Sequence, residues 1–194
     1  MNYKDFEIIL ASGSPRRKAF FEEMQLDFRT EVIPIEENFP LGLSGIEIAR
    51  HIAYKKSEAF LKKIKKNQLI ITADTIVWHE NESLGKPINN EEAKKMLNRL
   101  SDSQHQVITA VGFLTKEKIE MIHEVSTVTF GKLSEDEIDN YIMTRSPLDK
   151  AGGYGVQDSF GVRNIVSING SYTNIIGLPV AQVLKKIKEI VNKN

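Results

Sequence analysis

Apolar and polar residues alternate along the chain with two periods, one typical of strands and one typical of helices. Residues 8–11 form an apolar run that is typical of a buried strand, and residues 18–24 are amphipathic like a helix. The same patterns predict further strands at 28–35, 69–73, 104–114, 120–130 and 161–168, and further helices at 44–66, 91–100, 134–144 and from 177 onwards. Interleaved strands and helices, with two long strands in succession, predict an α/β fold: a mixed twisted sheet flanked by helices.

Capping and turn residues mark the ends of several of these elements. Ser14 stands where an N-cap belongs, and Pro15 stands where the first helical residue belongs. Asn90 is expected to cap the helix that follows it, and Ser134–Glu137 has the form of a capping box. Asn169–Gly170 is a pair that commonly closes a β-hairpin, so we expect a turn there.

Composition limits the class of protein. The 194 residues fit a single domain, 1–194, that is large enough to have two lobes, and 41% hydrophobic residues suffice for a sizeable core. Lys+Arg and Asp+Glu both number 26, and this zero net charge argues against a dedicated nucleic-acid binder. Residues 1–5 lack the layout of a signal peptide, and no apolar run approaches the ~20 residues of a membrane span. We therefore expect a soluble, cytoplasmic protein.

The stretch Ser12–Arg17 has the properties of a phosphate cradle. It joins a predicted strand to a predicted helix, whose N-terminal amides favour anions. Gly13 has no Cβ and lets a ligand approach the backbone, while Arg16 and Arg17 supply two guanidinium groups that match phosphate oxygens. The expected phosphate ligands in this stretch are Ser12, Ser14, Arg16 and Arg17. The alternative is that Ser-Pro only starts a helix and that the arginine pair is solvated.

Acidic residues in two segments could bind a divalent cation. Asp74 closes an apolar strand, and the carboxyl ends of strands line the ligand crevice of α/β proteins. Glu36 and Glu37 lie in a polar turn after an earlier strand. Mg²⁺ uses one or two carboxylates together with substrate phosphates and waters, which suits two such segments. The alternatives are that Asp74 only caps a turn and that the two glutamates are simply exposed.

Two further segments could meet a ligand. Lys86 lies between Gly85 and Pro87, where a stiff backbone could aim its ammonium group. A Gly-rich loop at 149–158 could approach a ligand closely, and Gln157 within it can both donate and accept, which suits the edge of a base. The loop could equally be an ordinary turn. Neither a P-loop nor a Gly-x-Gly-x-x-Gly turn is present, and the four histidines lack the spacing of metal ligands.

Several short segments, in order, resemble the motifs of the Maf family of nucleoside triphosphate pyrophosphatases. They are Ser12–Arg17, Ala73–Thr75, Gly85–Pro87 and Asp149–Gln157, and the resemblance extends to Gly177–Pro179. It implies a mixed α/β fold of two lobes around a cleft, similar to inosine triphosphate pyrophosphatases and often dimeric. It also implies cleavage of a nucleoside triphosphate between the α and β phosphates, with Mg²⁺ or Mn²⁺.

The resemblance also implies roles for individual residues. Asp74 corresponds to the proposed general base, and Glu37 corresponds to the acid before the second helix, which with Asp74 would hold the metal. Lys56 and Lys86 correspond to the family's two lysines at the phosphates. The glutamate pair stands where an Asp-containing pair is also common, which leaves open whether Glu36 or Glu37 binds metal. Ser57 follows Lys56 where the family usually has alanine.

The substrate branch follows from three further positions. Members with Arg, Thr and Gln at the positions of Arg16, Thr75 and Gln157 prefer dTTP and UTP, and this chain carries all three residues. Two other functions stay open at this point. One is a pyrophosphatase of the same fold for a modified or purine nucleotide. The other is a non-enzymatic regulator that binds a nucleotide or a division protein, for which a carboxylate beside phosphates would have little use.

Overall fold

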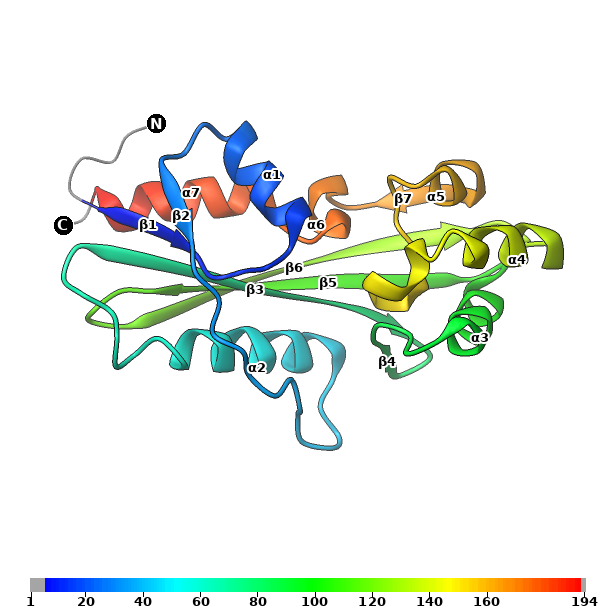
Figure 1. Cartoon of the computed structure of the whole chain (residues 1–194), viewed down its shortest axis with the longest axis horizontal. Coiled ribbons are helices and arrows are strands. Elements are labelled where there is room, and N and C mark those ends of the chain that lie inside the picture. The colour runs from blue at the N-terminus through cyan, green and yellow to red at the C-terminus, as the bar shows by residue number, and fades with distance from the viewer. Residues whose placement is uncertain (1–5, 193–194) are drawn as a thin grey trace. The chain divides into compact units, whose positions relative to one another are not determined.

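The computed structural model describes residues 6–192 (Figure 1). Residues 1–5, on which the expectation about a signal peptide rests, lie outside the described residues. A seven-stranded sheet has the order β2-β1-β3-β5-β6-β7, with β4 paired to β3. Its strands are β1 (Glu7–Leu10), β2 (Phe28–Thr30), β3 (Gln68–His79), β4 (Glu82–Leu84), β5 (Gln104–Leu114), β6 (Ile119–Phe130) and β7 (Ile165–Asn169). Parallel pairs at β1 and antiparallel pairs at β4 and β7 make the sheet mixed, which confirms the predicted fold class.

The chain divides into two compact units. The first comprises residues 1–74, 109–124 and 177–194, and the second comprises residues 75–108 and 125–176. The boundaries at 74/75, 108/109 and 124/125 fall inside β3, β5 and β6. The arrangement of these units as one domain around a cleft stays a prediction, and each unit is described by itself below.

In the first unit, helices cover both faces of the sheet. Figure 1 shows α1 (Pro15–Glu23) and α7 (Val180–Val191) on one face and α2 (Gly45–Glu58) on the other. Because side chains alternate along a strand, Ile8 and Leu10 pack toward the first face with Phe21 and Ile187. Ile9 enters a separate buried cluster on the second face, whose other members are Ala11, Phe60, Ile64, Ile70 and Leu114. Because side chains on both faces of β1 are buried, its sequence is a continuous run of apolar residues.

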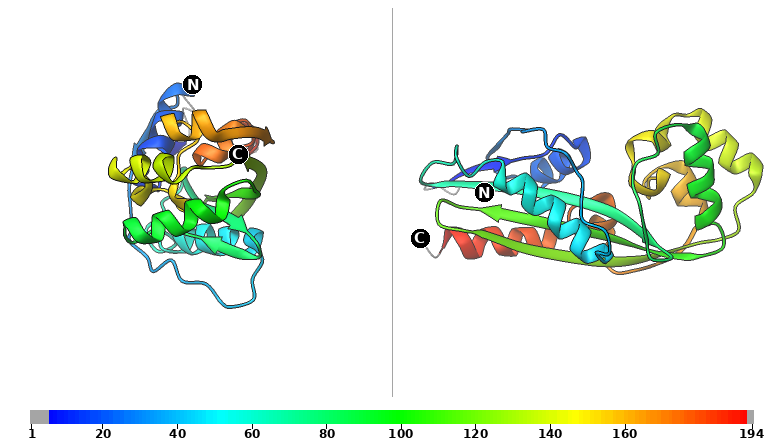
Figure 2. Two further views of the ribbon diagram at one scale, coloured as in Figure 1. Left: turned by 90° about the vertical axis from the view of Figure 1, so that its right-hand side faces the viewer. Right: turned by 90° about the horizontal axis from the view of Figure 1, so that it is seen from below.

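The second unit is built largely of helices and short turns, and Figure 2 shows it from two further directions. Its helices are α3 (Asn90–Leu100), α4 (Glu135–Met143), α5 (Ser159–Asn164) and α6 (Tyr172–Ile176), with the 3-10 turns η1 (Ser146–Asp149) and η2 (Ala151–Gly153). Stacked, tilted and edge-on rings link Phe130 to His105, Tyr154 and Phe160, and the last of these stacks on Tyr141. Tyr154 makes the Gly-rich loop part of this aromatic cluster.

Most predicted boundaries are confirmed, including Ser14 as N-cap, the capping box at Ser134–Glu137 and the strand 104–114. One cap is shifted by a residue, because Asn89 rather than Asn90 accepts the N–H of Glu92. Among the described residues, no helix is long and apolar enough to cross a membrane.

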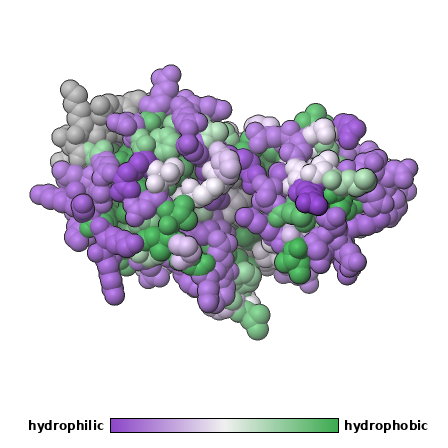
Figure 3. All heavy atoms as spheres, viewed as in Figure 1, coloured by the Kyte–Doolittle hydropathy of each residue, from purple (hydrophilic) through white to green (hydrophobic). Residues whose placement is uncertain are grey.

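Two elements of the first unit are shorter than predicted. Strand β2 ends at Thr30 instead of continuing to 35, because the chain from there to 44 is a largely exposed loop, interrupted by Pro34. The tip of this loop is hydrophobic on the surface (Figure 3), and Leu41 is almost fully exposed. Helix α2 ends at Glu58 rather than at 66, since Phe60 and Ile64 turn inward to the cluster on the second face. The lysine run at 62–66 therefore lies in a turn after the helix.

Strand β3 is longer than predicted, which corrects the position of Asp74. The residue lies within the strand and not at its carboxyl end. The strand continues to His79 because it forms a hairpin with β4, whose turn residues Glu80 and Asn81 have positive φ, as tight hairpins require.

The segment 161–168 was predicted as one strand, and this is wrong for its first half. Helix α5 occupies 159–164, and β7 begins only at Ile165. A helix fits because Gly161 packs against the Gly-rich loop, where a Cβ would come within 2.3 Å of the carbonyl oxygen of Gly155. The expected turn at Asn169–Gly170 is confirmed as a bend at Gly170, whose φ is +125°, but it leads from β7 into α6 and does not close a hairpin.

Candidate active site

The loop between β1 and α1 has the predicted capped geometry. The Ser14 hydroxyl accepts the N–H of Arg17 at 3.5 Å, and Pro15 begins the helix. The Ser12 hydroxyl, which is buried, accepts the N–H of Ser14 at 3.2 Å and a guanidinium N–H of Arg17 at 3.2 Å. Gly13 is exposed between them, so the backbone is accessible to a ligand at this point.

Arg17 points into the first unit, unlike the solvated arginine of the alternative interpretation. Its Nε donates to the carbonyl oxygen of Gly177 at 2.9 Å, and its Nη1 donates to that of Ala73 at 2.9 Å. Burial lowers the pKa of Arg17, and the nearby carboxylate of Asp74 partly counteracts the shift. An arginine remains charged under such a shift. Arg17 therefore ties the loop before α1 to β3 and to the residues that precede α7, and its direct contact with phosphate stays a prediction.

Asp74, Lys56 and Glu37 meet in the first unit, although they come from three segments. The Lys56 ammonium lies 2.8 Å from Asp74 Oδ1 and 2.8 Å from Glu37 Oε1. The Asp74 side chain is only 10% exposed, whereas that of Glu37 is 56% exposed. Glu36 instead accepts from the side-chain amide of Asn38 at 3.2 Å. Of the two glutamates left open by the sequence, Glu37 is thus the one that shares a partner with Asp74.

Two contacts fix the position of this cluster. Lys55 Nζ donates to the carbonyl oxygen of Glu36 at 3.1 Å and to Asn38 Oδ1 at 2.6 Å, which holds the loop that carries Glu37 against α2. The hydroxyls of Ser57 and Thr72 lie 2.8 Å apart, and the latter also donates to a backbone carbonyl of α2 at 2.9 Å.

Small residues let α2 approach the sheet closely at that second contact. A Cβ on Gly112 would come within 2.4 Å of the Ser57 hydroxyl and 2.7 Å of the Thr72 hydroxyl. Ser57, which stands where the family usually has alanine, is fully buried, and its contact with Thr72 helps to place Lys56.

Electrostatics make Asp74 a better base than a free aspartate. Burial raises the pKa of its carboxyl, and this effect outweighs the attraction of Lys56 and Arg17, which lowers it. A carboxylate with a raised pKa accepts a proton more readily. Sequence reasoning could assign only the free value of about 3.9 to this residue.

The donor set of the cluster fits a hard divalent cation. Asp74 and Glu37 each present a carboxylate oxygen to the same cationic centre, the ammonium of Lys56. Within residues 6–192, no group of three or more His, Cys, Asp and Glu side chains is arranged to hold a metal. Mg²⁺ does not require such a group, since it is commonly bound by one or two carboxylates and substrate phosphates.

Lys86 and Gln157 belong to the second unit. Lys86 is exposed, and its neighbour Gly85 accepts the N–H of Gly152 at 3.0 Å, so the Gly-Lys-Pro segment is hydrogen-bonded to the Gly-rich loop. Gly152 has φ +69°, and a Cβ there would meet Val77 at 2.9 Å, which explains the glycine. Gln157 is also exposed.

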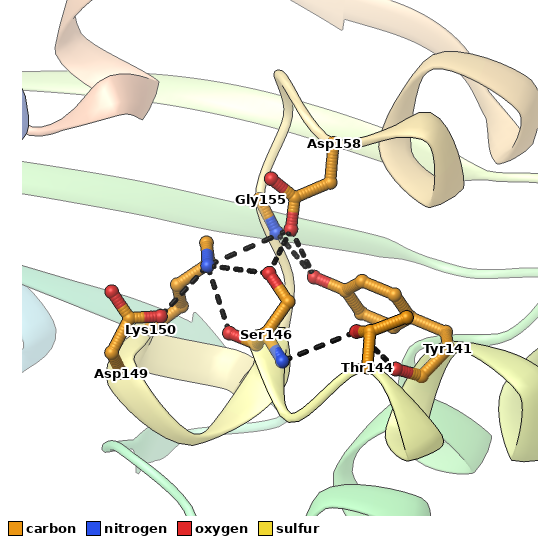
Figure 4. A network of polar contacts seen from close by, with 7 residues as sticks. All are labelled: Tyr141, Thr144, Ser146, Asp149, Lys150, Gly155 and Asp158. Carbon is orange, nitrogen blue, oxygen red and sulfur yellow. Dashed lines mark hydrogen bonds and ion pairs between the residues drawn. The ribbon is translucent and has the colours of Figure 1, made fainter.

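The structure also places Thr75 and Lys150. Because successive residues of a strand point to opposite faces, the side chain of Thr75 does not share the face on which Asp74 meets Lys56. Lys150 is bound within its own loop, where it donates to Asp149 and to Ser146 (Figure 4). The roles predicted for Thr75 and Gln157 in base selection stay predictions.

A family model described as "Maf-like protein" matches residues 7–190. The chain is 44% identical to a dTTP/UTP pyrophosphatase of Flavobacterium johnsoniae, with 97% of both chains covered, and 47% identical to one of Flavobacterium psychrophilum, with 93% of both covered. It is 42% identical to a dTTP/UTP pyrophosphatase of Bacteroides fragilis, over 97% of this chain and 98% of the relative. Among solved structures, a HAM1 protein from Coxiella burnetii matches 97% of this chain and 100% of its own at 15% identity and a TM-score of 0.50, which supports the fold alone.

Proposed function

Because the chain belongs to the Maf family, we propose that it is a dTTP/UTP pyrophosphatase. The relatives of that name align with nearly its full length at 40–47% identity. The observation that carries the proposal in the structure is the meeting of Asp74, Lys56 and Glu37 beside the capped loop 12–17. A buried carboxylate held by an ammonium group, next to a phosphate-binding helix start, suits hydrolysis of a phosphoanhydride.

In the proposed reaction, water attacks the α phosphorus of the nucleoside triphosphate. The new P–O bond forms as the bond from the α phosphorus to the bridging oxygen breaks, which gives the nucleoside monophosphate and pyrophosphate. Asp74 accepts the proton of the water, and the raised pKa of its carboxyl favours that transfer. Lys56 holds Asp74 in place and, with Arg16 and Lys86, stabilises the negative charge that develops on the pyrophosphate.

We further propose that the enzyme uses Mg²⁺ or Mn²⁺, held by Asp74 and Glu37. The exposure of Glu37 and the convergence of both carboxylates on Lys56 support this assignment. When bound, such an ion lowers the pKa of water and neutralises phosphate charge. The Ser12 and Ser14 hydroxyls and the exposed backbone at Gly13 would bind phosphate oxygens beside it.

Base selection is assigned to Gln157, together with Arg16 and Thr75. Uracil and thymine present two carbonyl oxygens on either side of an N–H, whereas cytosine replaces one oxygen by an amino group. The exposed amide of Gln157 can donate to a carbonyl and accept from the N–H. A site that pairs such groups rejects a ligand that leaves them unpaired, by up to ~10⁴-fold.

The experiment that tests the proposal is a panel of nucleoside triphosphates assayed with Mg²⁺, with pyrophosphate and orthophosphate measured separately. We expect pyrophosphate and the monophosphate from UTP and dTTP, and little product from CTP. Release of orthophosphate and a diphosphate would contradict the proposal, and a preference for a purine or modified nucleotide would favour the alternative pyrophosphatase. A protein that binds nucleotides but releases neither product would be the non-enzymatic regulator. A homodimer, a cytoplasmic location and the lack of a stable nucleic-acid complex stay predictions from the sequence.

A further inference from the structure

The residue assigned to base reading lies within a closed turn of the second unit. The N–H of Asp158 donates to the carbonyl oxygen of Gly155 at 3.1 Å, which closes a four-residue turn with Val156 and Gln157 at its centre. The side chain of Val156 is buried, whereas that of Gln157 is exposed. The direction in which Gln157 points therefore depends on how the two ends of this turn are held.

One hydroxyl binds both ends of the turn. Tyr141, on α4, donates its O–H to Asp158 Oδ2 at 2.6 Å and accepts the backbone N–H of Gly155 at 3.1 Å (Figure 4). Its ring stacks on Phe160 with centroids 4.3 Å apart, so the hydroxyl is carried by a side chain that is itself fixed. Burial and the bond to Asp158 raise the pKa of Tyr141, so it stays a donor at neutral pH.

The carboxylate of Asp158 is fixed by more than this one bond. The Ser146 hydroxyl donates to the same oxygen at 2.7 Å, and the Lys150 ammonium lies 3.6 Å from it. Lys150 also donates to the backbone carbonyl and the hydroxyl of Ser146, each at 2.8 Å. The turn is thus anchored to α4 and η1 by the side chains of Tyr141, Ser146 and Lys150.

We propose that Tyr141 is a positioning residue for base selection, which clamps the turn 155–158 and so fixes the side chain of Gln157 in the orientation that reads the base. The inference rests on the proposed function. A hydrogen-bonding side chain discriminates between bases only if it cannot reorient to suit the wrong one. Without the hydroxyl, the N–H of Gly155 and the carboxylate of Asp158 lose their common partner, and the turn can change shape.

The chain offers a matched control in the same loop. Tyr154 is also buried, and its hydroxyl lies 2.6 Å from His105 Nε2, away from the ends of the turn. Tyr141→Phe and Tyr154→Phe each remove one buried hydroxyl and keep a packed ring. Only the former removes the clamp, so a general loss of stability affects both variants, whereas a loss of positioning affects one.

The experiment compares wild type, Tyr141→Phe, Tyr154→Phe and Gln157→Ala in steady-state release of pyrophosphate from UTP and CTP, with inhibition by inorganic pyrophosphate as the probe of phosphate binding. We expect Tyr141→Phe to lower the UTP-to-CTP ratio of kcat/KM by about tenfold, since misplacement of an orienting group by 1 Å can cost up to ~10²-fold. Gln157→Ala should lower the ratio at least as far, and Tyr154→Phe should leave it unchanged. Inhibition by pyrophosphate should be unaltered in the three variants.

Amide hydrogen exchange supplies a second measurement that does not involve a substrate. The N–H of Gly155 should exchange faster in Tyr141→Phe than in wild type, and its rate should be unchanged in Tyr154→Phe. An unchanged ratio in Tyr141→Phe, or equal losses in both tyrosine variants, overturns the inference and leaves the proposed function intact. A wild-type protein that releases no pyrophosphate from UTP overturns the proposed function and the inference with it.

Discussion

Asp74 combines deep burial with a salt bridge to Lys56, and its replacement separates catalysis from stability. We expect Asp74→Asn to lose ~10²–10⁴-fold in turnover, the usual cost of a missing general base. Its melting temperature at neutral pH should stay close to that of wild type, because Lys56 keeps its ion pair with Glu37 and the cost of burying the Asp74 charge is removed. Kinetics and a melting curve on the same sample check this. Persistent activity with a lower melting temperature would make Asp74 a purely structural residue.

Arg16 and Arg17 are adjacent and of the same residue type, but replacement of each by lysine should have different effects on stability and activity. The guanidinium group of Arg17 donates hydrogen bonds to Ser12, Ala73 and Gly177. The ammonium group of a lysine cannot donate in the same three directions. We expect Arg17→Lys to lower the free energy of unfolding by about 2 kcal/mol as well as activity. Arg16→Lys should lower turnover, because a single ammonium group cannot match two phosphate oxygens as a guanidinium does. Urea unfolding and UTP hydrolysis measure both effects, and an unchanged stability of Arg17→Lys would show that Arg17 has no structural role.

The sequence could predict which residues are candidates, but not how each is used. The pair at 16–17, the acids at 36–37 and Asp74 were found from residue type and from neighbouring turns. The Arg17 side chain points inward because it donates to the carbonyl oxygens of Ala73 and Gly177, which are distant in the sequence. The choice of Glu37 over Glu36 depends on the packing of a loop against α2. Such contacts are set by tertiary structure, and no local pattern encodes them.

At the scale of elements, the aromatic cluster of the second unit should make stability dependent on pH. Burial lowers the pKa of His105 from 6.5 to about 3, and Nε2 bonds to Tyr154. Below pH 6.5, His105 is protonated in the unfolded chain but stays neutral in the folded chain. The free energy of unfolding therefore falls as pH decreases toward 3. The loss from this residue approaches about 1.4 kcal/mol per pH unit.

Urea unfolding at several values between pH 7 and pH 4.5 measures that effect. In His105→Gln, which has no titrating side chain at this position, we expect the free energy of unfolding to fall less steeply over the same interval. The difference between the two slopes should correspond to about one proton. Parallel curves for both proteins would mean that His105 binds its proton equally in the folded and unfolded chains.

Element prediction succeeded where a local signal was strong and failed where packing decided. Caps and alternating strands located α1, α4, β5 and β6 to within a residue or two. The end of α2 was missed because Phe60 and Ile64 are buried in a turn, a choice that helical periodicity cannot reveal. The helix α5 was taken for a strand because the close packing of Gly161 on the Gly-rich loop leaves no trace in the local sequence.

At the scale of the whole molecule, the two units should unfold together. Each is assembled from discontinuous segments, and β3, β5 and β6 contribute residues to both. Loss of strand pairing in one unit would interrupt the same strands in the other. The only tryptophan, Trp78, lies in the second unit and reports on it, while circular dichroism reports on the helices of both. We expect the two signals to give one urea midpoint. Separate midpoints would show that the units are independent.

The passage of the boundaries through strands also constrains how such a protein can evolve. Recombination that replaced residues 125–176, which include the turn 155–158, would have to join foreign sequence to β6 in mid-strand. A mismatch of one residue at such a junction would turn every following side chain to the opposite face. We therefore expect this architecture to tolerate point substitutions in loops such as 155–158 better than an exchange of whole segments.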